Sequence, residues 1–145
     1  MAIAGLMALA VVAFVTVSGI TYRPDLSIPP GRKGQHVTIE GNPLRVQQVG
    51  AGPELLLIHG CPGSIEDWDT VVDTLARDFR VTTYDRPGHG YSGWDGVLYS
   101  YDYQANVALR LIEHLQLKDV VVVGHSYGGT TALAIAMRKP ANVKC

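Results

Sequence analysis

A serine flanked by two glycines, in Gly124-His125-Ser126-Tyr127-Gly128, follows four valines and precedes a stretch of small residues. The valines predict a buried strand and the small apolar residues a helix, which places the serine at a sharp strand–turn–helix junction. Such a turn holds the serine in a strained conformation with its hydroxyl projecting beyond the sheet, and glycines at its flanks avoid collisions with neighbouring elements. The pattern therefore favours a nucleophilic serine at position 126.

Backbone amides near this serine predict a site for a developing negative charge. The amide of Tyr127 follows the serine at the positive end of the expected helix. A second donor is expected from His59-Gly60-Cys61-Pro62-Gly63, the loop after an earlier apolar run. Since proline has no N–H, the Cys61 amide is the better candidate. His59 and Gly60 are expected to contact substrate, together with His125. The alternative is that His59 and Gly60 form only a structural turn.

Other kinds of site do not fit the sequence. A dinucleotide fingerprint requires glycine where Ser126 stands, and a P-loop requires a Gly-Lys-Ser/Thr that is absent before Lys139. Twelve basic and 13 acidic side chains give a net charge of −1, which does not favour nucleic-acid binding. The two cysteines, Cys61 and Cys145, lack metal-site spacing and are interpreted as free thiols, so we expect neither a metal nor a cofactor.

The elements expected around Ser126 alternate between strands and helices. An apolar–polar alternation around a Gly-Asn turn predicts a β-hairpin over 36–40 and 44–49 with one solvated face. Apolar runs predict strands buried on both faces at 55–58 and 120–123, a further strand is expected at 81–84, and periodicity predicts helices over 67–76, 103–117 and 128–137. This order is typical of an α/β fold with a doubly wound, mostly parallel sheet that follows an N-terminal hairpin.

The chain begins with an apolar segment. No residue from Ile3 to Ile20 is charged, and a spanning helix needs about 20 apolar residues. Residues 1–22 are therefore predicted to form one hydrophobic helix that anchors the protein in a membrane. The alternative is a cleaved secretory signal, which would make the protein secreted or periplasmic. Residues 23–35, rich in proline and glycine, are interpreted as a linker, and residues 36–145 as a partial α/β domain.

Three motifs give this sequence a resemblance to the α/β-hydrolase fold family. They are His-Gly-x-Pro-Gly at 59–63, Asp-Arg-Pro-Gly-His-Gly-x-Ser at 85–92 and Gly-His-Ser-Tyr-Gly-Gly at 124–129. Their order matches the N-terminal half of the family, over roughly 37–140. The resemblance implies a serine hydrolase that forms an acyl-enzyme on a small-molecule ester or related acyl substrate, with Ser126 as nucleophile.

The same resemblance distinguishes branches of the family. It implies structural roles for Asp85, Arg86 and His89. Haloalkane dehalogenases and the related epoxide hydrolases have aspartate at the nucleophile position, so Ser126 argues against both chemistries.

Two members of a serine hydrolase triad are missing from the sequence. The family's triad runs serine, acid, histidine along the chain, yet residues 127–145 contain no Asp, Glu or His. We expect both beyond Cys145 and expect residues 36–145 alone to be inactive, with an unpaired apolar edge at the strand over 120–123. His59 or His89 could approach Ser126, although each has another expected role. The alternatives are a non-catalytic member of the fold and a small anchored interaction module.

Overall fold

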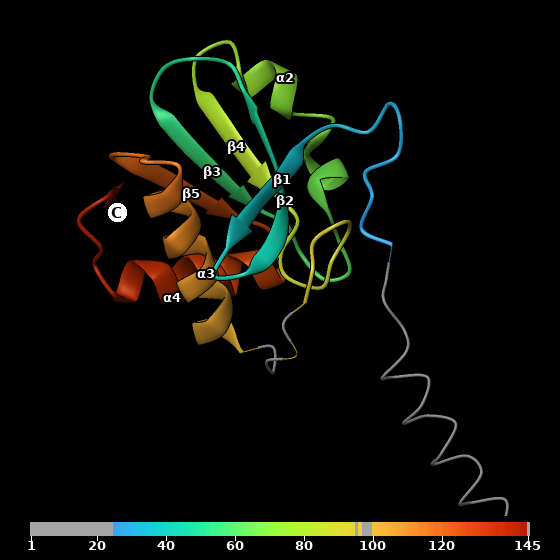
Figure 1. Cartoon of the computed structure of the whole chain (residues 1–145). Coiled ribbons are helices and arrows are strands. Elements are labelled where there is room, and N and C mark those ends of the chain that lie inside the picture. The colour runs from blue at the N-terminus through green and yellow to red at the C-terminus, as the bar shows by residue number, and fades with distance from the viewer. Residues whose placement is uncertain (1–24, 95, 97–99, 145) are drawn as a thin grey trace, which may run out of the picture.

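The computed structural model describes residues 25–94, 96 and 100–144, and these form a six-stranded sheet with helices packed against it (Figure 1). The strands are β1 (Gln35–Ile39), β2 (Asn42–Val49), β3 (Glu54–Ile58), β4 (Arg80–Tyr84), β5 (Val120–Gly124) and β6 (Val143–Lys144). The helical segments are the 3-10 turn η1 (Ile65–Trp68) and the α-helices α2 (Val72–Leu75), α3 (Tyr101–His114) and α4 (Tyr127–Met137).

The strand order β1-β2-β4-β3-β5-β6 confirms the predicted α/β architecture. β1 pairs antiparallel with β2, as the hairpin pattern predicts, and β2 pairs antiparallel with β4. β4, β3, β5 and β6 then run parallel to one another. A parallel pair needs a crossover connection, and the segments with η1, α2, α3 and α4 provide these connections.

Buried apolar side chains lie on both faces of the sheet. One cluster joins α3 and α4 to the sheet through residues that include Leu56, Leu111 and Ile135. The other joins η1 and α2 to the sheet through Leu55, Leu57, Val72 and Val81, with Trp68 packed against them. Alternate residues of β3 therefore serve opposite faces, which is why this strand is an unbroken apolar run.

The register of the central strands brings the three sequence motifs together. Ile58 at the end of β3 pairs with Tyr84 of β4 on one side and with Gly124 of β5 on the other. The loops that follow these three residues therefore leave the same edge of the sheet side by side. In open α/β sheets, ligands bind at this carboxyl edge.

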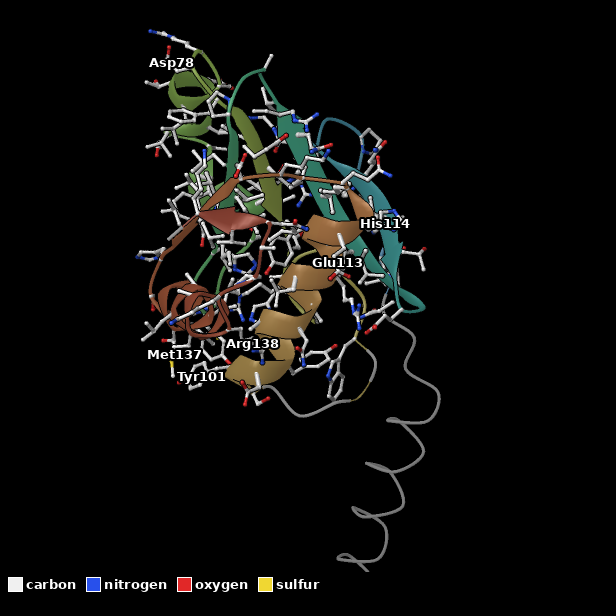
Figure 2. The ribbon with its side chains drawn as sticks, turned by 90° about the vertical axis from the view of Figure 1, so that its left-hand side faces the viewer. Asp78, Tyr101, Glu113, His114, Met137 and Arg138 are labelled. Carbon is white, nitrogen blue, oxygen red and sulfur yellow. The ribbon has the colours of Figure 1, made fainter. Side chains whose placement is uncertain are left out.

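Two helices of the chain are tied together at one end by polar contacts. The Arg138 guanidinium, after α4, donates to the Asp102 carboxylate at 2.8 Å and to Asn106 Oδ1 at 2.7 Å. Figure 2 shows Arg138 near Tyr101, the first residue of α3. α3 begins two residues earlier than predicted because the Ser100 side chain caps it by accepting from the Tyr103 amide at 3.1 Å.

Two details of the predicted hairpin and first helix are wrong. The hairpin has no single solvated face, since Arg45 and Val46 are adjacent in β2 and both buried. The helix predicted over 67–76 is divided into η1 and α2, which holds four residues only. Between them lie Asp69, Thr70 and Val71, residue types that disfavour helix.

The strand over 120–123 also differs from its prediction. Val121 and Val123 are 38% and 41% exposed, because η1 and α2 cover β3 and β4 but do not reach β5. The edge of β5 is not wholly unpaired either, since Val120 and Val121 pair with β6. β5 is therefore buried on one face and paired along part of its outer edge.

The expected N-terminal helix at 1–22 lies outside the described residues. Among residues 25–94, 96 and 100–144, no helix has the length and apolar composition needed to cross a bilayer. This finding contradicts the predicted membrane-anchored or secreted location. In the predicted linker, residues 25–34 have no helix or strand, but Arg32 pairs with Glu66 and Lys33 pairs with Asp69, so its end is fastened to the domain.

Candidate active site

Ser126 lies at the turn between β5 and α4, where the sequence places it. Its backbone has φ 51° and ψ −119°, a conformation that a residue with a side chain adopts only under strain. The His125 amide donates to the Ile58 carbonyl at 3.0 Å, and the Ser126 carbonyl accepts from the Gly129 amide at 2.8 Å. The turn is thus fixed to the sheet before it and to the helix after it, and Ser126 is exposed.

The two glycines beside the turn are required by close packing. A Cβ on Gly124 would collide with the carbonyl oxygen of Gly128, in the first turn of α4. A Cβ on Gly128 would collide with the carbonyl oxygen of Ile58, at the end of β3. The predicted collisions with helix and strand are therefore confirmed, and they explain why the helix can begin directly behind the serine.

The loop over 59–63 lies against the serine turn. A Cβ built on Gly60 would be 3.2 Å from the Ser126 Cβ and 3.1 Å from His125 Nδ1, so a side chain there would crowd the serine turn. Neither the Cys61 amide nor the Tyr127 amide donates to another group in the loops and caps of the described chain. Both amides therefore lack a backbone acceptor among the described residues.

His59 has both ring nitrogens engaged within the protein. Its side chain is fully buried, its Nδ1–H donates to the Gly60 carbonyl at 2.8 Å, and its Nε2 accepts from the Arg86 amide at 2.9 Å. Burial, with the nearby Arg86 charge, lowers the pKa of His59 to about 3. The ring is therefore neutral at physiological pH, is shielded from solvent, and links the Gly60 carbonyl to the Arg86 amide.

His89 and Arg86 complete this buried group. The Arg86 guanidinium donates to His89 Nε2 at 3.2 Å, and His89 Nδ1–H donates to the Pro87 carbonyl at 3.0 Å. Burial is the main cause that lowers the pKa of His89. Arg86 itself is 1% exposed and lies 4.5 Å from the centre of the Tyr127 ring.

A second polar group lies behind the loop over 85–92. The buried Asp85 carboxylate accepts from the amides of Ile65 and Tyr91 at 2.7 and 2.8 Å. It also accepts from Arg45 at 3.2 Å, while Arg45 makes a two-pronged pair with Glu66 at 2.7 and 3.1 Å. The hydrogen bonds from Arg45 lower the pKa of Glu66 to about 2, so this acid stays ionised.

Sequence reasoning missed Arg45 altogether, because the hairpin pattern placed it on a solvated face. The signal that could have identified it is the acidic residue in the motif over 85–92. A buried aspartate requires a cation or amides around it, and Arg45 is the cation.

His125 is exposed and borders a cavity of about 480 Å³ with Asp67, Trp68, Thr70 and Val71. This cavity lies on the side of the sheet covered by η1 and α2. The remaining histidines are elsewhere: His36 Nε2 contacts the Tyr91 carbonyl at 2.8 Å, and His114 ends α3. The described histidines therefore provide no ring paired with Ser126.

Comparison with known proteins agrees with this geometry. A family model described as the alpha/beta hydrolase fold matches residues 53–145. The chain is 38% identical over 91 residues to a non-heme haloperoxidase of Rhodococcus erythropolis, covering 62% of this chain and 33% of that protein. It is 35% identical over 105 residues to a pimeloyl-acyl-carrier-protein methyl ester esterase of Nitrosospira multiformis, covering 70% of this chain and 39% of that protein.

Solved structures give the same result. An alpha/beta hydrolase fold protein from Burkholderia ambifaria superposes with a TM-score of 0.68 at 29% identity, covering 81% of this chain and 41% of that one. The chain thus spans between a third and two fifths of the length of the two curated relatives named above. With the family match extending over more than half of its residues, this chain belongs to the alpha/beta hydrolase fold family.

Proposed function

We propose that this chain carries the nucleophile of a serine hydrolase that cleaves a small-molecule ester or related acyl bond. The observation that supports this most is the strained backbone of Ser126 at the start of α4, with exposed surface on the serine and an unoccupied amide on the next residue. A turn of this kind presents a hydroxyl to a substrate at the carboxyl edge of the sheet. The ester activity named for the Nitrosospira relative is consistent with the proposal.

In the proposed reaction, Ser126 Oγ attacks the carbonyl carbon of the substrate while a histidine takes its proton. The negative charge that develops on the carbonyl oxygen is stabilised by the amides of Tyr127 and Cys61. The tetrahedral intermediate then expels the alcohol, which receives the proton, and leaves an acyl group on Ser126. Water, activated by the same histidine, hydrolyses the acyl-enzyme and regenerates the serine.

The histidine and its acid partner are not supplied by the residues described. His59 is buried with both nitrogens engaged, and His89 Nε2 accepts from Arg86. A general base must come within about 2.6–3.2 Å of the proton that it takes. We therefore propose that both groups come from sequence beyond these 145 residues in the full-length protein.

The test is hydrolysis of a p-nitrophenyl ester by the full-length protein and by its Ser126→Ala variant. We expect the variant to lose kcat by about 10⁴-fold or more, because removing a nucleophile disables the whole triad. Ser27→Ala, which alters an exposed serine outside the domain, serves as the matched control and should retain full activity. An unchanged rate in Ser126→Ala would favour the alternative, a member of the fold that does not use this serine.

A further inference from the structure

We propose that Arg86 is a positioning residue that orients and polarises the Gly60–Cys61 peptide, so that the Cys61 amide can stabilise the substrate oxyanion. This inference rests on the proposed hydrolase function, in which that amide is one of two donors. It assigns a role to a side chain that the resemblance alone treats as structural.

The first step is the set of hydrogen bonds around the loop over 59–63. Arg86 Nε donates to the His59 carbonyl at 3.1 Å, and Arg86 Nη2 donates to the Gly60 carbonyl at 2.7 Å. The Gly60 carbonyl also accepts from His59 Nδ1–H at 2.8 Å. Two donors, one of them charged, therefore fix the direction in which this carbonyl points.

The second step follows from the planarity of the peptide group. The Gly60–Cys61 bond is trans, and in a trans peptide the C=O and the N–H point in opposite directions. With the Gly60 carbonyl directed at Arg86, the Cys61 N–H is directed away from it. Since Gly60 lies against Ser126, the fixed N–H remains beside the nucleophile.

The third step concerns charge. In the described part of the chain no carboxylate lies within 4.0 Å of the Arg86 guanidinium, so no ion pair neutralises it. A hydrogen bond from a cation to a carbonyl polarises that peptide and makes its N–H a stronger donor. The positive charge also favours negative charge that develops nearby, because the Arg86 side chain is buried and water screens its charge weakly.

The fourth step is the contact with the second donor residue. The Arg86 guanidinium lies 4.5 Å from the centre of the Tyr127 ring. The centre of the Tyr101 ring lies 4.9 Å from the centre of the Tyr127 ring. Arg86 therefore contacts the Gly60 carbonyl, in the same peptide group as the Cys61 amide, and the side chain of Tyr127, the residue with the other proposed amide. A single buried side chain sets the spacing between the 59–63 loop and the start of α4.

The experiment compares Arg86→Lys with Arg45→Lys in the full-length protein. Arg45 is the matched control, because it is an equally buried arginine that contacts Glu66 and Asp85 but not the 59–63 loop. For each variant we would measure kcat and KM on a p-nitrophenyl ester, the affinity for a trifluoromethyl ketone, and unfolding in denaturant. Ser126 Oγ adds to the ketone carbonyl, giving its proton to the histidine base, and the resulting hemiketal places an oxyanion where the substrate would.

For folded Arg86→Lys we expect kcat to fall by about 10- to 100-fold with KM little changed, somewhat less than the loss of an entire oxyanion donor. The ketone affinity should fall by a similar factor. Arg45→Lys should lose stability. Its kcat and ketone affinity should stay within about twofold of the wild type, because Arg45 does not contact the 59–63 loop.

The outcomes separate this inference from the proposed function. If Ser126→Ala is inactive but folded Arg86→Lys keeps wild-type kcat and ketone affinity, the positioning role is wrong and the function stands. An equal loss of ketone affinity in Arg45→Lys would also overturn the role. If Arg86→Lys does not fold, Tyr127→Leu, which removes the ring that Arg86 contacts, should weaken ketone binding several-fold, and an unchanged affinity there contradicts the inference. Activity in Ser126→Ala contradicts the proposed function itself.

Discussion

Two arginine side chains are buried at the same end of the sheet, and their surroundings differ in charge. Arg45 is fully buried and is paired with the carboxylates of Glu66 and Asp85. Arg86 is 1% exposed and, among the described residues, its guanidinium donates to carbonyl oxygens and a neutral histidine ring. One group is neutralised on site, and the other keeps a net positive charge next to Ser126.

This difference separates a structural group from a group suited to chemistry. The Arg45 group joins β2 to η1 and to the loop after β4, and its Nε also donates to the Lys33 carbonyl at 2.8 Å. Burying a cation without an acid partner is costly. That cost is reasonable where a reaction generates a transient negative charge, and the Arg86 group lies beside the serine that would generate it.

The largest expected effect comes from breaking the Arg45 group with Asp85→Ala. The change removes one of the two carboxylates that accept from the buried Arg45, and it removes the acceptor of the buried Ile65 amide and of the partly buried Tyr91 amide. We expect a loss of about 3–5 kcal/mol in the free energy of unfolding, as for other broken buried pairs. Denaturant unfolding of the full-length protein measures it.

The control for Asp85→Ala is Glu113→Gln, which breaks the exposed pair between Arg110 and Glu113 on α3. An exposed pair of this kind contributes about 0.2–0.5 kcal/mol. Equal losses in the two variants would show that the Arg45 group is no more important than a surface pair.

A smaller loss is expected from Ser92→Ala in the same group. The Ser92 hydroxyl accepts from the Arg45 amide at 2.8 Å and donates to the Asp85 carbonyl at 2.6 Å. Its removal leaves one buried donor and one buried acceptor without that partner, which costs about 1–3 kcal/mol. Denaturant unfolding should show this loss, and Ser92→Thr, which keeps the hydroxyl, should lose less if its methyl group fits. A neutral effect of Ser92→Ala would contradict the assignment of these bonds.

The smallest expected effect is the change in the free energy of unfolding per pH unit. It distinguishes the Arg86 group from the Arg45 group. Burial lowers the pKa of His59 to about 3, whereas the unfolded chain binds this proton below about 6.5. The stability that the neutral His59 ring contributes is complete above pH 6.5. It declines as the pH falls toward 3, by up to about 1.4 kcal/mol per pH unit. His89, with a pKa shifted in the same direction, adds to this decline. Arg45 lowers the pKa of Glu66 to about 2, so the stability that ionised Glu66 contributes is complete above about pH 4.5 and is lost only as the pH falls below that value.

Denaturant unfolding between pH 7 and 4.5 would therefore report on the histidines of the Arg86 group and not on Glu66 of the Arg45 group. The His59→Gln variant should show a shallower decline than the wild type in that interval. Parallel curves for the two proteins would show that His59 is not held neutral in the folded state.

The sequence predicts the elements that short-range patterns control. β3, β4 and the turn at Ser126 are confirmed, because apolar runs and the glycines beside the serine leave few other conformations. The break between η1 and α2 was not predicted, since a hydrophobic stripe over 67–76 exists whether or not the backbone is continuous. Local pattern could not separate a helix from two shorter turns with the same inward side chains.

The polar groups around the site are less accessible to sequence reasoning. Arg45 meets Glu66 and Asp85 across separations of 21 and 40 residues, and Arg86 meets Gly60 across 26. Such contacts depend on which strands become neighbours. Three motifs mark the loops, but only the register of β3 with β4 and β5 shows that these loops are neighbours.

The most direct measurement of the central claim is covalent labelling of the full-length protein with a fluorophosphonate, followed by mass spectrometry of its peptides. An activated serine displaces fluoride and retains the phosphonyl group, whereas an ordinary hydroxyl does not react. The proposed function predicts a single adduct on Ser126 that disappears in Ser126→Ala. A full-length, folded protein that hydrolyses esters while Ser126 remains unlabelled would contradict it.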